Sequence, residues 1–472
     1  MKHEMVGPAF ERAQLRRTLG RQRLSISQGT LDVRVRGDRL FPQSIVGRFM
    51  ILCAILRQIA LVLSTGLFSS ELKALAPDVI FVDQLSVCVP LFRLIYPRAR
   101  ILFYGHYPDR LLVKQDQGWT KYIKQIYRIP FDALEEWSTG CSDSIVVNSK
   151  YTRSVYRTTF PWFRARSLRV IYPCVDTKRS EEKTATPSIW PEKKLFLSIN
   201  RFEGKKDLSL AVEACAGLTA QERSKARLVI AGGYDPAIHE NVRTHKALQE
   251  LADSLKLTHA TFKPQDPSLS DLSTEDVDVL FLLSVPHELK TRLLQSASIL
   301  IYTPTNEHFG IVPLEAMLAG VPVLATNTGG PLETIYDGRT GWLRSPSKTD
   351  QWTDVMRKPL IPSSADSLKK MGQAGRDRVL AEFSETKMTQ LFDHEVRRVI
   401  ENNDKRPEVM PEWLYALLWI LAIAIPAIAL TMKAMWWAIE ISEGKSADEI
   451  FKSATNTVSS AVSSATDSHG EL

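Results

Sequence analysis

Two strand–loop–helix units follow one another between residues 298 and 335, and this stretch constrains the fold more than any other part of the chain. The apolar run SILIY (298–302) predicts a buried strand, and a helix is expected to begin at or near Pro313, after Gly310 has broken the pattern. The run VPVLAT (321–326) predicts a second buried strand, which a Gly-Gly-Pro turn connects to another helix. Successive units of this kind are typical of a parallel α/β sheet.

The loops of such a sheet lie at the carboxyl ends of its strands. Backbone N–H groups at a helix start carry the positive end of the helix dipole, so a phosphorylated ligand is expected at these junctions. Two carboxylates lie on the element, Glu307 in the loop and Glu315 one turn into the helix, with seven residues between them. Together they can hold two hydroxyl-bearing parts of one ligand. On spacing alone, a second interpretation stays open, in which Glu315 only stabilises the helix start and Glu307 is solvated.

Composition excludes some classes of protein. A chain of 472 residues has room for two or three domains, and its net charge of +7 suits a protein that works near phosphates or lipid headgroups. Nucleic acid is disfavoured as a partner, because the sequence contains no compact basic helix, zinc motif or aromatic RNA-binding signature. The five cysteines are scattered and form no C-x-x-C pair, which argues against both a disulfide framework and a zinc site.

One segment near the C-terminus is apolar enough to cross a membrane. Residues 413–432 form a run of twenty without a charge, and tryptophan and tyrosine side chains flank it as they do at bilayer interfaces. We therefore expect a transmembrane helix over 413–432 and a weakly ordered or amphipathic tail over 433–472; a buried core helix is the alternative. Basic residues on both sides leave the orientation open. No signal peptide is predicted, because residues 1–20 lack an apolar run.

The run NEHFGIVPLEAM, followed by GGPLETI, resembles the E-x7-E signature of the retaining sugar-nucleotide glycosyltransferases of family 4. Enzymes of this family have the GT-B fold, in which two Rossmann-like lobes face a cleft. Within the family, the long form of the motif is similar to that of the α-1,3/1,6-mannosyltransferases of the dolichol-linked oligosaccharide pathway. The resemblance covers about residues 30–400 and is densest in the second half of the chain.

The resemblance implies roles for individual residues of this motif. Glu307 would lie beside the donor sugar, as a catalytic residue. Backbone groups of Phe309, Gly310 and Ile311 would meet the sugar hydroxyls and the phosphate. Glu315 would bind the ribose hydroxyls.

A basic loop over residues 200–207 follows the first predicted strand of the second lobe. Arg201 and Lys206 are expected at the carboxyl end of that strand, where a guanidinium fork and an ammonium charge suit phosphate oxygens. From the residues alone, a pair of solvated charges is the favoured interpretation. The resemblance implies that both neutralise the leaving diphosphate, and that Lys205 is the less suitable of the two lysines.

His106 follows the predicted strand at the start of ARILFYGHYPD (99–109), again at a carboxyl end that faces the expected cleft. A lone histidine at such a place can be structural or catalytic. The sequence GHYPD resembles the family's His-Phe-Pro-Asp site. This implies that His106 contacts the transferred sugar or the acceptor from the N-terminal lobe, with Asp109 as its neighbour.

The predicted organisation has six parts. They are a basic N-terminus (1–30), an acceptor-side lobe (31–180), a linker (181–193), a nucleotide-sugar-binding lobe with a crossover helix (194–400), the transmembrane helix and the tail. Residues 1–30 contain no strand–glycine-loop–helix unit like the one that opens the family's N-terminal lobe. We therefore expect that lobe to be incomplete.

The activity that the resemblance implies is transfer of mannose from GDP-mannose to dolichol-pyrophosphate-linked Man-GlcNAc2, first α-1,3 and then α-1,6, with retention. The implied location is the endoplasmic reticulum membrane, with the catalytic lobes on the cytosolic face. No metal or cofactor is expected, and a complex with other transferases of the pathway is left open. Retention by double displacement would need a carboxylate nucleophile, for which Glu307 is the candidate, whereas the resemblance favours attack on the face that the diphosphate leaves.

Two other functions stay open at the level of the sequence. The first is a truncated, inactive, membrane-tethered GT-B scaffold that still binds nucleotide sugar, which the missing N-terminal unit favours. The second is a sugar-nucleotide enzyme of different chemistry, such as an epimerase of similar fold, which the predicted transmembrane helix and the long motif disfavour.

Overall fold

The computed structural model describes residues 3–5, 31–33, 41–42, 50–66, 71–108, 119–177, 189–263 and 276–401. The chain divides into two compact units, Met1–Pro407 and Glu408–Leu472, and every described residue belongs to the first. The predicted transmembrane helix, the tail, Asp109 and most of the predicted linker lie outside the described residues. Within those residues, no helix is both long and apolar enough to cross a membrane.

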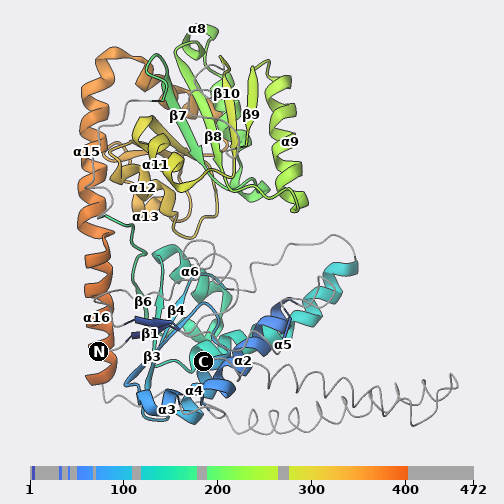
Figure 1. Ribbon diagram of the computed structural model, residues 1–472, viewed down its shortest axis with the longest axis vertical. Coiled ribbons are helices and arrows are strands. Elements are labelled where there is room, and N and C mark those ends of the chain that lie inside the picture. Colours follow the sequence, from blue (N-terminus) through green and yellow to red (C-terminus); the bar gives the residue numbers. More distant parts are fainter. Residues whose placement is uncertain are drawn as a thin grey trace, which may run out of the picture. The chain divides into compact units, whose positions relative to one another are not determined.

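A parallel sheet of seven strands forms what we call the C-terminal lobe, and it has the order β13-β12-β11-β7-β8-β10-β9. Figure 1 shows β7, β8, β10 and β9 side by side. The strands are β7 (Lys194–Ile199), β8 (Ala226–Gly232), β9 (His259–Phe262), β10 (Val279–Leu283), β11 (Ala297–Tyr302), β12 (Val323–Thr326) and β13 (Gly341–Arg344). Strands β8–β10 lie on one side of β7 and β11–β13 on the other. The order therefore reverses between β7 and β11, and a ligand crevice is expected at their carboxyl ends.

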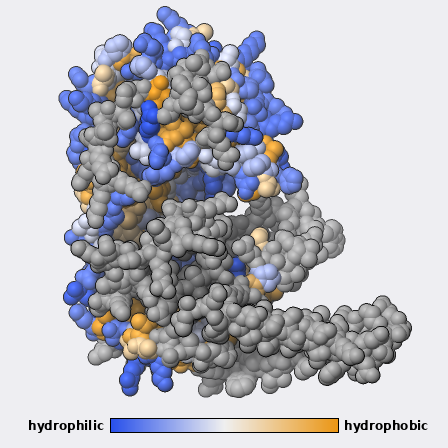
Figure 2. Space-filling model, in the orientation of Figure 1, coloured by the Kyte–Doolittle hydropathy of each residue, from blue (hydrophilic) through white to orange (hydrophobic). Residues whose placement is uncertain are grey.

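Helices cover both faces of this sheet, because its strands are apolar at successive positions. In β10, Leu280 and Leu282 belong to one buried cluster, and Phe281 between them belongs to the other. The helices are α7 (Ser209–Ala216), α8 (Ala220–Arg223), α9 (His239–Ser254), α11 (His287–Ser296), α12 (Ile311–Leu318), α13 (Pro331–Thr334), α14 (Thr349–Arg357) and α15 (Ala365–Glu382). In Figure 2 the surface over α8 and α9 is mostly hydrophilic, as expected for helices that turn one side to solvent.

A second parallel sheet, of order β3-β4-β5-β6, forms the N-terminal lobe. Its strands are β3 (Val79–Asp83), β4 (Arg100–Gly105), β5 (Ser144–Val147) and β6 (Leu168–Val170). Its helices are α2 (Met50–Gly66), α3 (Glu71–Leu75), α4 (Cys88–Ile95), α5 (Trp119–Gly140) and α6 (Lys150–Thr159). A separate parallel pair, β1 (His3–Met5) and β2 (Leu31–Val33), places a three-residue strand within the predicted basic N-terminus.

The last described helix, α16 (Glu385–Glu401), belongs in sequence to the C-terminal lobe but packs on the N-terminal one. Four of its apolar side chains lie against a buried cluster of the four-stranded sheet that includes Leu102, Tyr104 and Val146; they are Met388, Leu391, Phe392 and Val396. The Ser144 hydroxyl on β5 donates a hydrogen bond to the buried carboxylate of Glu395. This helix therefore ties the two lobes together.

Candidate active site

Two loops meet at the point where the strand order reverses. Residues 200–207 follow β7 and residues 303–310 follow the adjacent strand β11. A 3-10 helix, η4 (Gly204–Lys206), ends at Asp207, whose φ of 46° turns the chain into α7. The Thr303 hydroxyl donates a hydrogen bond to the Lys206 carbonyl oxygen, at 2.6 Å. The loop after β11 thus fixes the position of Lys206.

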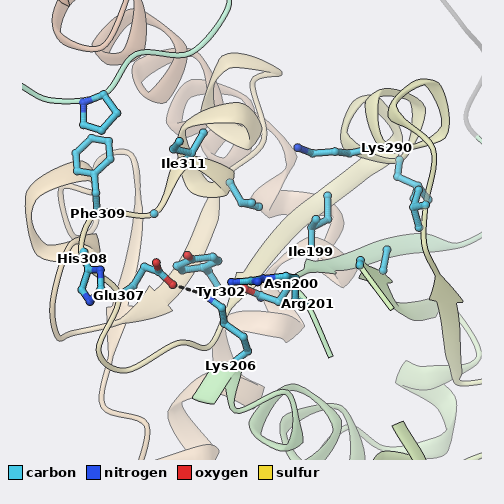
Figure 3. A pocket seen from close by; sticks show the side chains of 18 of the residues that line it. Ile199, Asn200, Arg201, Lys206, Lys290, Tyr302, Glu307, His308, Phe309 and Ile311 are labelled. Atoms are coloured by element: carbon cyan, nitrogen blue, oxygen red, sulfur yellow. Dashed lines mark hydrogen bonds and ion pairs between the residues drawn. The ribbon is translucent and has the colours of Figure 1, made fainter. Parts of the chain in front are cut away.

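A cavity of about 530 Å³ opens at these loops, and residues of both lobes line it. This volume lies within the range of roughly 300–1,000 Å³ that is usual for small-molecule sites. Most of the site residues that the sequence predicts line the cavity: His106, Arg201, Lys206, Glu307, Phe309, Gly310 and Ile311. Figure 3 shows Lys206, Tyr302 and Glu307 grouped together, with Ile311 at the start of α12.

Glu307 is the electrostatic centre of the site. Its carboxylate forms an ion pair with the ammonium of Lys206 and accepts a hydrogen bond from the Tyr302 hydroxyl. Burial by itself would raise the pKa of Glu307, but the charge of Lys206 and the two hydrogen bonds outweigh burial and lower this pKa. Burial also raises the pKa of Tyr302, so the phenol keeps its proton and remains a donor. The site therefore holds a carboxylate whose charge is balanced by one lysine.

Glycines shape the loop around this carboxylate. Gly310 has a φ of 84°, and a Cβ there would lie 3.1 Å from the Tyr302 hydroxyl. The N–H of Gly330 donates to the Glu307 carbonyl at 2.7 Å, and a Cβ on Gly330 would lie 2.3 Å from the Phe309 Cα. Side chains at either position would displace the loop.

The helix α12 begins at the cavity, and its first two residues, Ile311 and Val312, line it. The free N–H groups of this first turn suit an anion such as a phosphate. The Phe309 ring is buried and stacks on Tyr172, with 5.4 Å between the ring centroids. The side chain of Phe309 is thus engaged in packing, so a contact of this residue with a ligand would be made by its backbone.

The basic loop divides its charges between two carboxylates. Arg201 Nη1 lies 3.0 Å from Glu203 Oε1, and Lys205 Nζ lies 3.1 Å from Glu203 Oε2. Lys206, and not Lys205, pairs with Glu307. The Arg201 side chain is 64% exposed, so it can turn toward a bound phosphate at little cost.

Glu315 does not line the cavity, although the sequence predicts it as a binding residue. Its Oε1 lies 2.7 Å from the ammonium of Lys290 on α11, and Lys290 does line the cavity. Lys290 was not predicted from the sequence. Its signal is its place in the first turn of a helix that follows the apolar strand β10.

His106 is held by a carboxylate that the sequence analysis also missed. Its Nε2 lies 2.8 Å from Asp83 Oδ1, and its ring meets that of Tyr104 edge to face at 5.0 Å. A carboxylate only accepts, so Nε2 carries the proton and Nδ1 is the acceptor of the neutral ring. Asp83 ends β3 and His106 follows the adjacent strand β4, a juxtaposition that the strand pattern could have indicated.

His308 is a further cavity residue that the sequence analysis did not assign. Its ring stacks on that of Tyr107 in the N-terminal lobe, with centroids 3.5 Å apart. Burial lowers the pKa of His308 to about 4, so its imidazole is neutral at physiological pH. It therefore adds no positive charge beside Glu307.

Two Rossmann-like α/β lobes with a cavity where the strand order reverses have the architecture of the GT-B fold. No group of three or more potential metal-ligating side chains is found in the part of the chain that the structure describes. The family described as "Glycosyltransferase Family 4" matches residues 37–179, and "Glycosyl transferases group 1" matches 180–276 and 273–378.

Curated relatives with high sequence identity show which kind of glycosyltransferase this is. The chain is 46% identical over 421 residues to alpha-1,3/1,6-mannosyltransferase alg-2 of Neurospora crassa, with 87% of each chain covered. It is 40% identical over 400 residues to the Saccharomyces cerevisiae ALG2 enzyme, with 80% of this chain and 76% of the other covered. The protein belongs to the α-1,3/1,6-mannosyltransferase family of N-glycan precursor assembly. The inactive-scaffold and epimerase alternatives have no support.

Solved structures agree on the fold. Sucrose-phosphate synthase from Thermosynechococcus elongatus superposes with a TM-score of 0.56 at 17% identity, covering 83% of this chain and 94% of the other. Anabaena HepE in complex with UDP-glucose gives a TM-score of 0.54 at 14% identity, covering 84% and 91%. At these identities the likeness supports the GT-B fold and nothing more specific.

Proposed function

We propose that the cavity binds GDP-mannose and that the enzyme transfers mannose to a dolichol-pyrophosphate-linked oligosaccharide, with retention at the anomeric carbon. The observation that carries this proposal is the Lys206–Glu307 pair beside the first turn of α12. It places a cation, a carboxylate and free backbone N–H groups around one cavity. These are the groups that a sugar diphosphate requires.

In this proposal, positive groups stabilise the departing diphosphate. The N–H groups of Ile311 and Val312, which line the cavity at the start of α12, would bind the phosphate, and Lys206 would supply the compensating charge that a metal ion provides in other enzymes. Arg201 exchanges Glu203 for phosphate oxygens when the donor binds. Glu315 remains the proposed ligand of the ribose hydroxyls, and would leave Lys290 to bind them.

The environment of Glu307 supports attack on the same face that the diphosphate leaves. Its carboxylate is already engaged by Lys206 and Tyr302, which makes it a weak nucleophile and a good acceptor for a sugar hydroxyl. The bond from the anomeric carbon to the phosphate oxygen breaks as the bond to the acceptor oxygen forms. The leaving phosphate takes the proton of the acceptor hydroxyl, and His106, which lines the cavity from the N-terminal lobe, would contact the transferred sugar or the acceptor.

Nucleotide binding tests the donor site. GDP should bind the purified full-length protein more tightly than UDP, and Arg201→Ala should weaken GDP binding about tenfold, since a charge-assisted hydrogen bond contributes roughly 1.5–3 kcal/mol. Isothermal titration calorimetry measures both. Lys205→Ala is the matched control, because Lys205 shares Glu203 as a partner but does not line the cavity. An unchanged GDP affinity in Arg201→Ala would mean that this charge is only solvated.

We also propose that the enzyme acts at the cytosolic face of the endoplasmic reticulum membrane and that the 413–432 segment anchors it there. The length and uncharged character of this segment support the proposal. Removal of residues 411–472 should release the protein from membranes. Flotation of cell membranes measures this, and a truncated protein that still floats with the membrane fraction would show that another segment anchors it.

A further inference from the structure

A carboxylate of the C-terminal lobe caps a helix of the N-terminal lobe. Glu333, on the short helix α13, accepts a hydrogen bond from the N–H of Lys150 at 2.8 Å through Oε2 and from the N–H of Tyr151 at 2.6 Å through Oε1. The hydroxyl of Tyr172 also donates to Oε2, at 3.0 Å. One side chain thus accepts three hydrogen bonds, two of them from the first turn of α6 (Lys150–Thr159) in the N-terminal lobe.

These contacts complete the cap of α6. The N-cap residue Ser149 accepts a hydrogen bond from the N–H of Thr152 at 2.9 Å, which leaves the N–H groups of Lys150 and Tyr151 without a partner inside the helix. Glu333 binds both, and its negative charge faces the positive end of the helix dipole. Within the described residues, these two N–H groups therefore find their protein partner across the lobes.

Hydrogen bonds connect both partners of this contact, α13 and α6, to residues of the active site. On the donor side, Arg378 Nη2 donates to the Glu333 carbonyl at 2.8 Å, and the turn before α13 is bonded to the Glu307 carbonyl through Gly330. On the acceptor side, the Thr152 hydroxyl donates to the His106 carbonyl at 3.3 Å. The hydroxyl of Ser149 also donates to the His308 carbonyl, at 2.6 Å.

We propose that Glu333 is a positioning residue for mannosyl transfer: it holds the first turn of α6 against the donor loop and so places His106 opposite Glu307. The donor site itself needs no such contact, because Lys206, Glu307 and α12 all belong to the C-terminal lobe. Loss of the Glu333 contact should therefore impair transfer while nucleotide binding persists. The transfer part of this proposal rests on the proposed function.

Glu333→Gln tests the contact with little change of shape. A glutamine has one acceptor oxygen, and its NH2 group would face one of the two backbone donors. We expect kcat for mannose transfer to fall about tenfold or more, and the affinity for GDP to change less than about twofold. Amide hydrogen exchange at Lys150 and Tyr151 should accelerate. Glu222→Gln is the matched control, because Glu222 caps α8 within a single lobe and bonds the Thr219 N–H at 2.8 Å.

Lys150→Pro removes one of the donors from the other side of the contact. Proline is tolerated at the first position of a helix, and the extended backbone of Ser149 (φ −161°, ψ 162°) suits a residue that precedes proline. The double variant Glu333→Gln/Lys150→Pro should lose no more kcat than the more impaired single variant. A residue that only stabilises its own lobe would give additive losses.

The experiments distinguish a failure of the Glu333 proposal from a failure of the proposed mannosyl transfer. Unchanged exchange at Lys150 and Tyr151 in Glu333→Gln would overturn the proposal, as would unchanged kcat or additive losses in the double variant. If the wild-type protein transferred no mannose, the proposed function would fail and the positioning role would fall with it. Faster amide exchange in Glu333→Gln would still establish the contact between the lobes.

Discussion

Glu307→Gln is expected to lower kcat for mannose transfer by about 10²–10³-fold, the scale of loss when one preorganised electrostatic contact to a transition state is removed. The substitution keeps the shape of the side chain but takes away the charge that pairs with Lys206, and it leaves one acceptor oxygen where the carboxylate has two. An oxocarbenium-like sugar then loses the carboxylate beside it. Steady-state kinetics with a saturating donor measures the change.

GDP affinity is the internal control for this variant. The N–H groups of α12 and the charges of Lys206 and Arg201 remain, so GDP should bind Glu307→Gln at least as tightly as it binds the wild type. Retention of full activity would remove Glu307 from the mechanism. Loss of both activity and GDP binding would instead point to a collapsed loop.

Lys206→Met is expected to have an effect of similar size on kcat, about 10²–10³-fold, for two reasons. The diphosphate loses a cation at its leaving oxygen, and Glu307 keeps its burial but loses the charge that lowers its pKa. The pKa of Glu307 should then rise, since burial favours the neutral acid. The acid limb of the pH–activity profile should move to higher pH.

The same substitution changes the pH dependence of stability. In the wild type, the pKa of Glu307 is lower in the folded than in the unfolded protein, so the stability from this group is present above the unfolded pKa and is lost as pH falls through the folded pKa. In Lys206→Met this stabilising contribution should shrink, because burial still raises the pKa of Glu307 and the lysine no longer opposes it. Denaturant titration at several pH values measures the change in the free energy of unfolding. If the acid limb of the pH–activity profile did not move in Lys206→Met, that result would contradict the account.

The strands and the positions of the loops could be predicted because they depend on local patterns. The run 298–302 lies within β11, and α12 begins at Ile311, two residues before Pro313. The second strand begins at Val323 and not at Val321. The reason is that the N–H of Val321 donates to the Ala316 carbonyl at 2.9 Å and so closes the end of α12.

The partners of the site residues could not be predicted in the same way. Lys290 and Glu315 are 25 residues apart, and Lys150 and Glu333 are 183 apart. Periodicity shows which face of an element is buried, but not which side chains of distant segments meet. Tyr302 could have been predicted as a site residue, because a tyrosine at the carboxyl end of a buried strand places a hydroxyl at the edge where ligands bind.

The most direct test of the account is transfer itself. The full-length protein, in detergent or reconstituted in vesicles, is incubated with GDP-mannose and a pyrophosphate-lipid-linked Man-GlcNAc2 acceptor, and the products are digested with mannosidases of known linkage specificity. We expect products with one and then two added mannoses, all of them released by α-specific enzymes. A protein that binds GDP but transfers no mannose, or one that forms a β-linkage, would contradict the account.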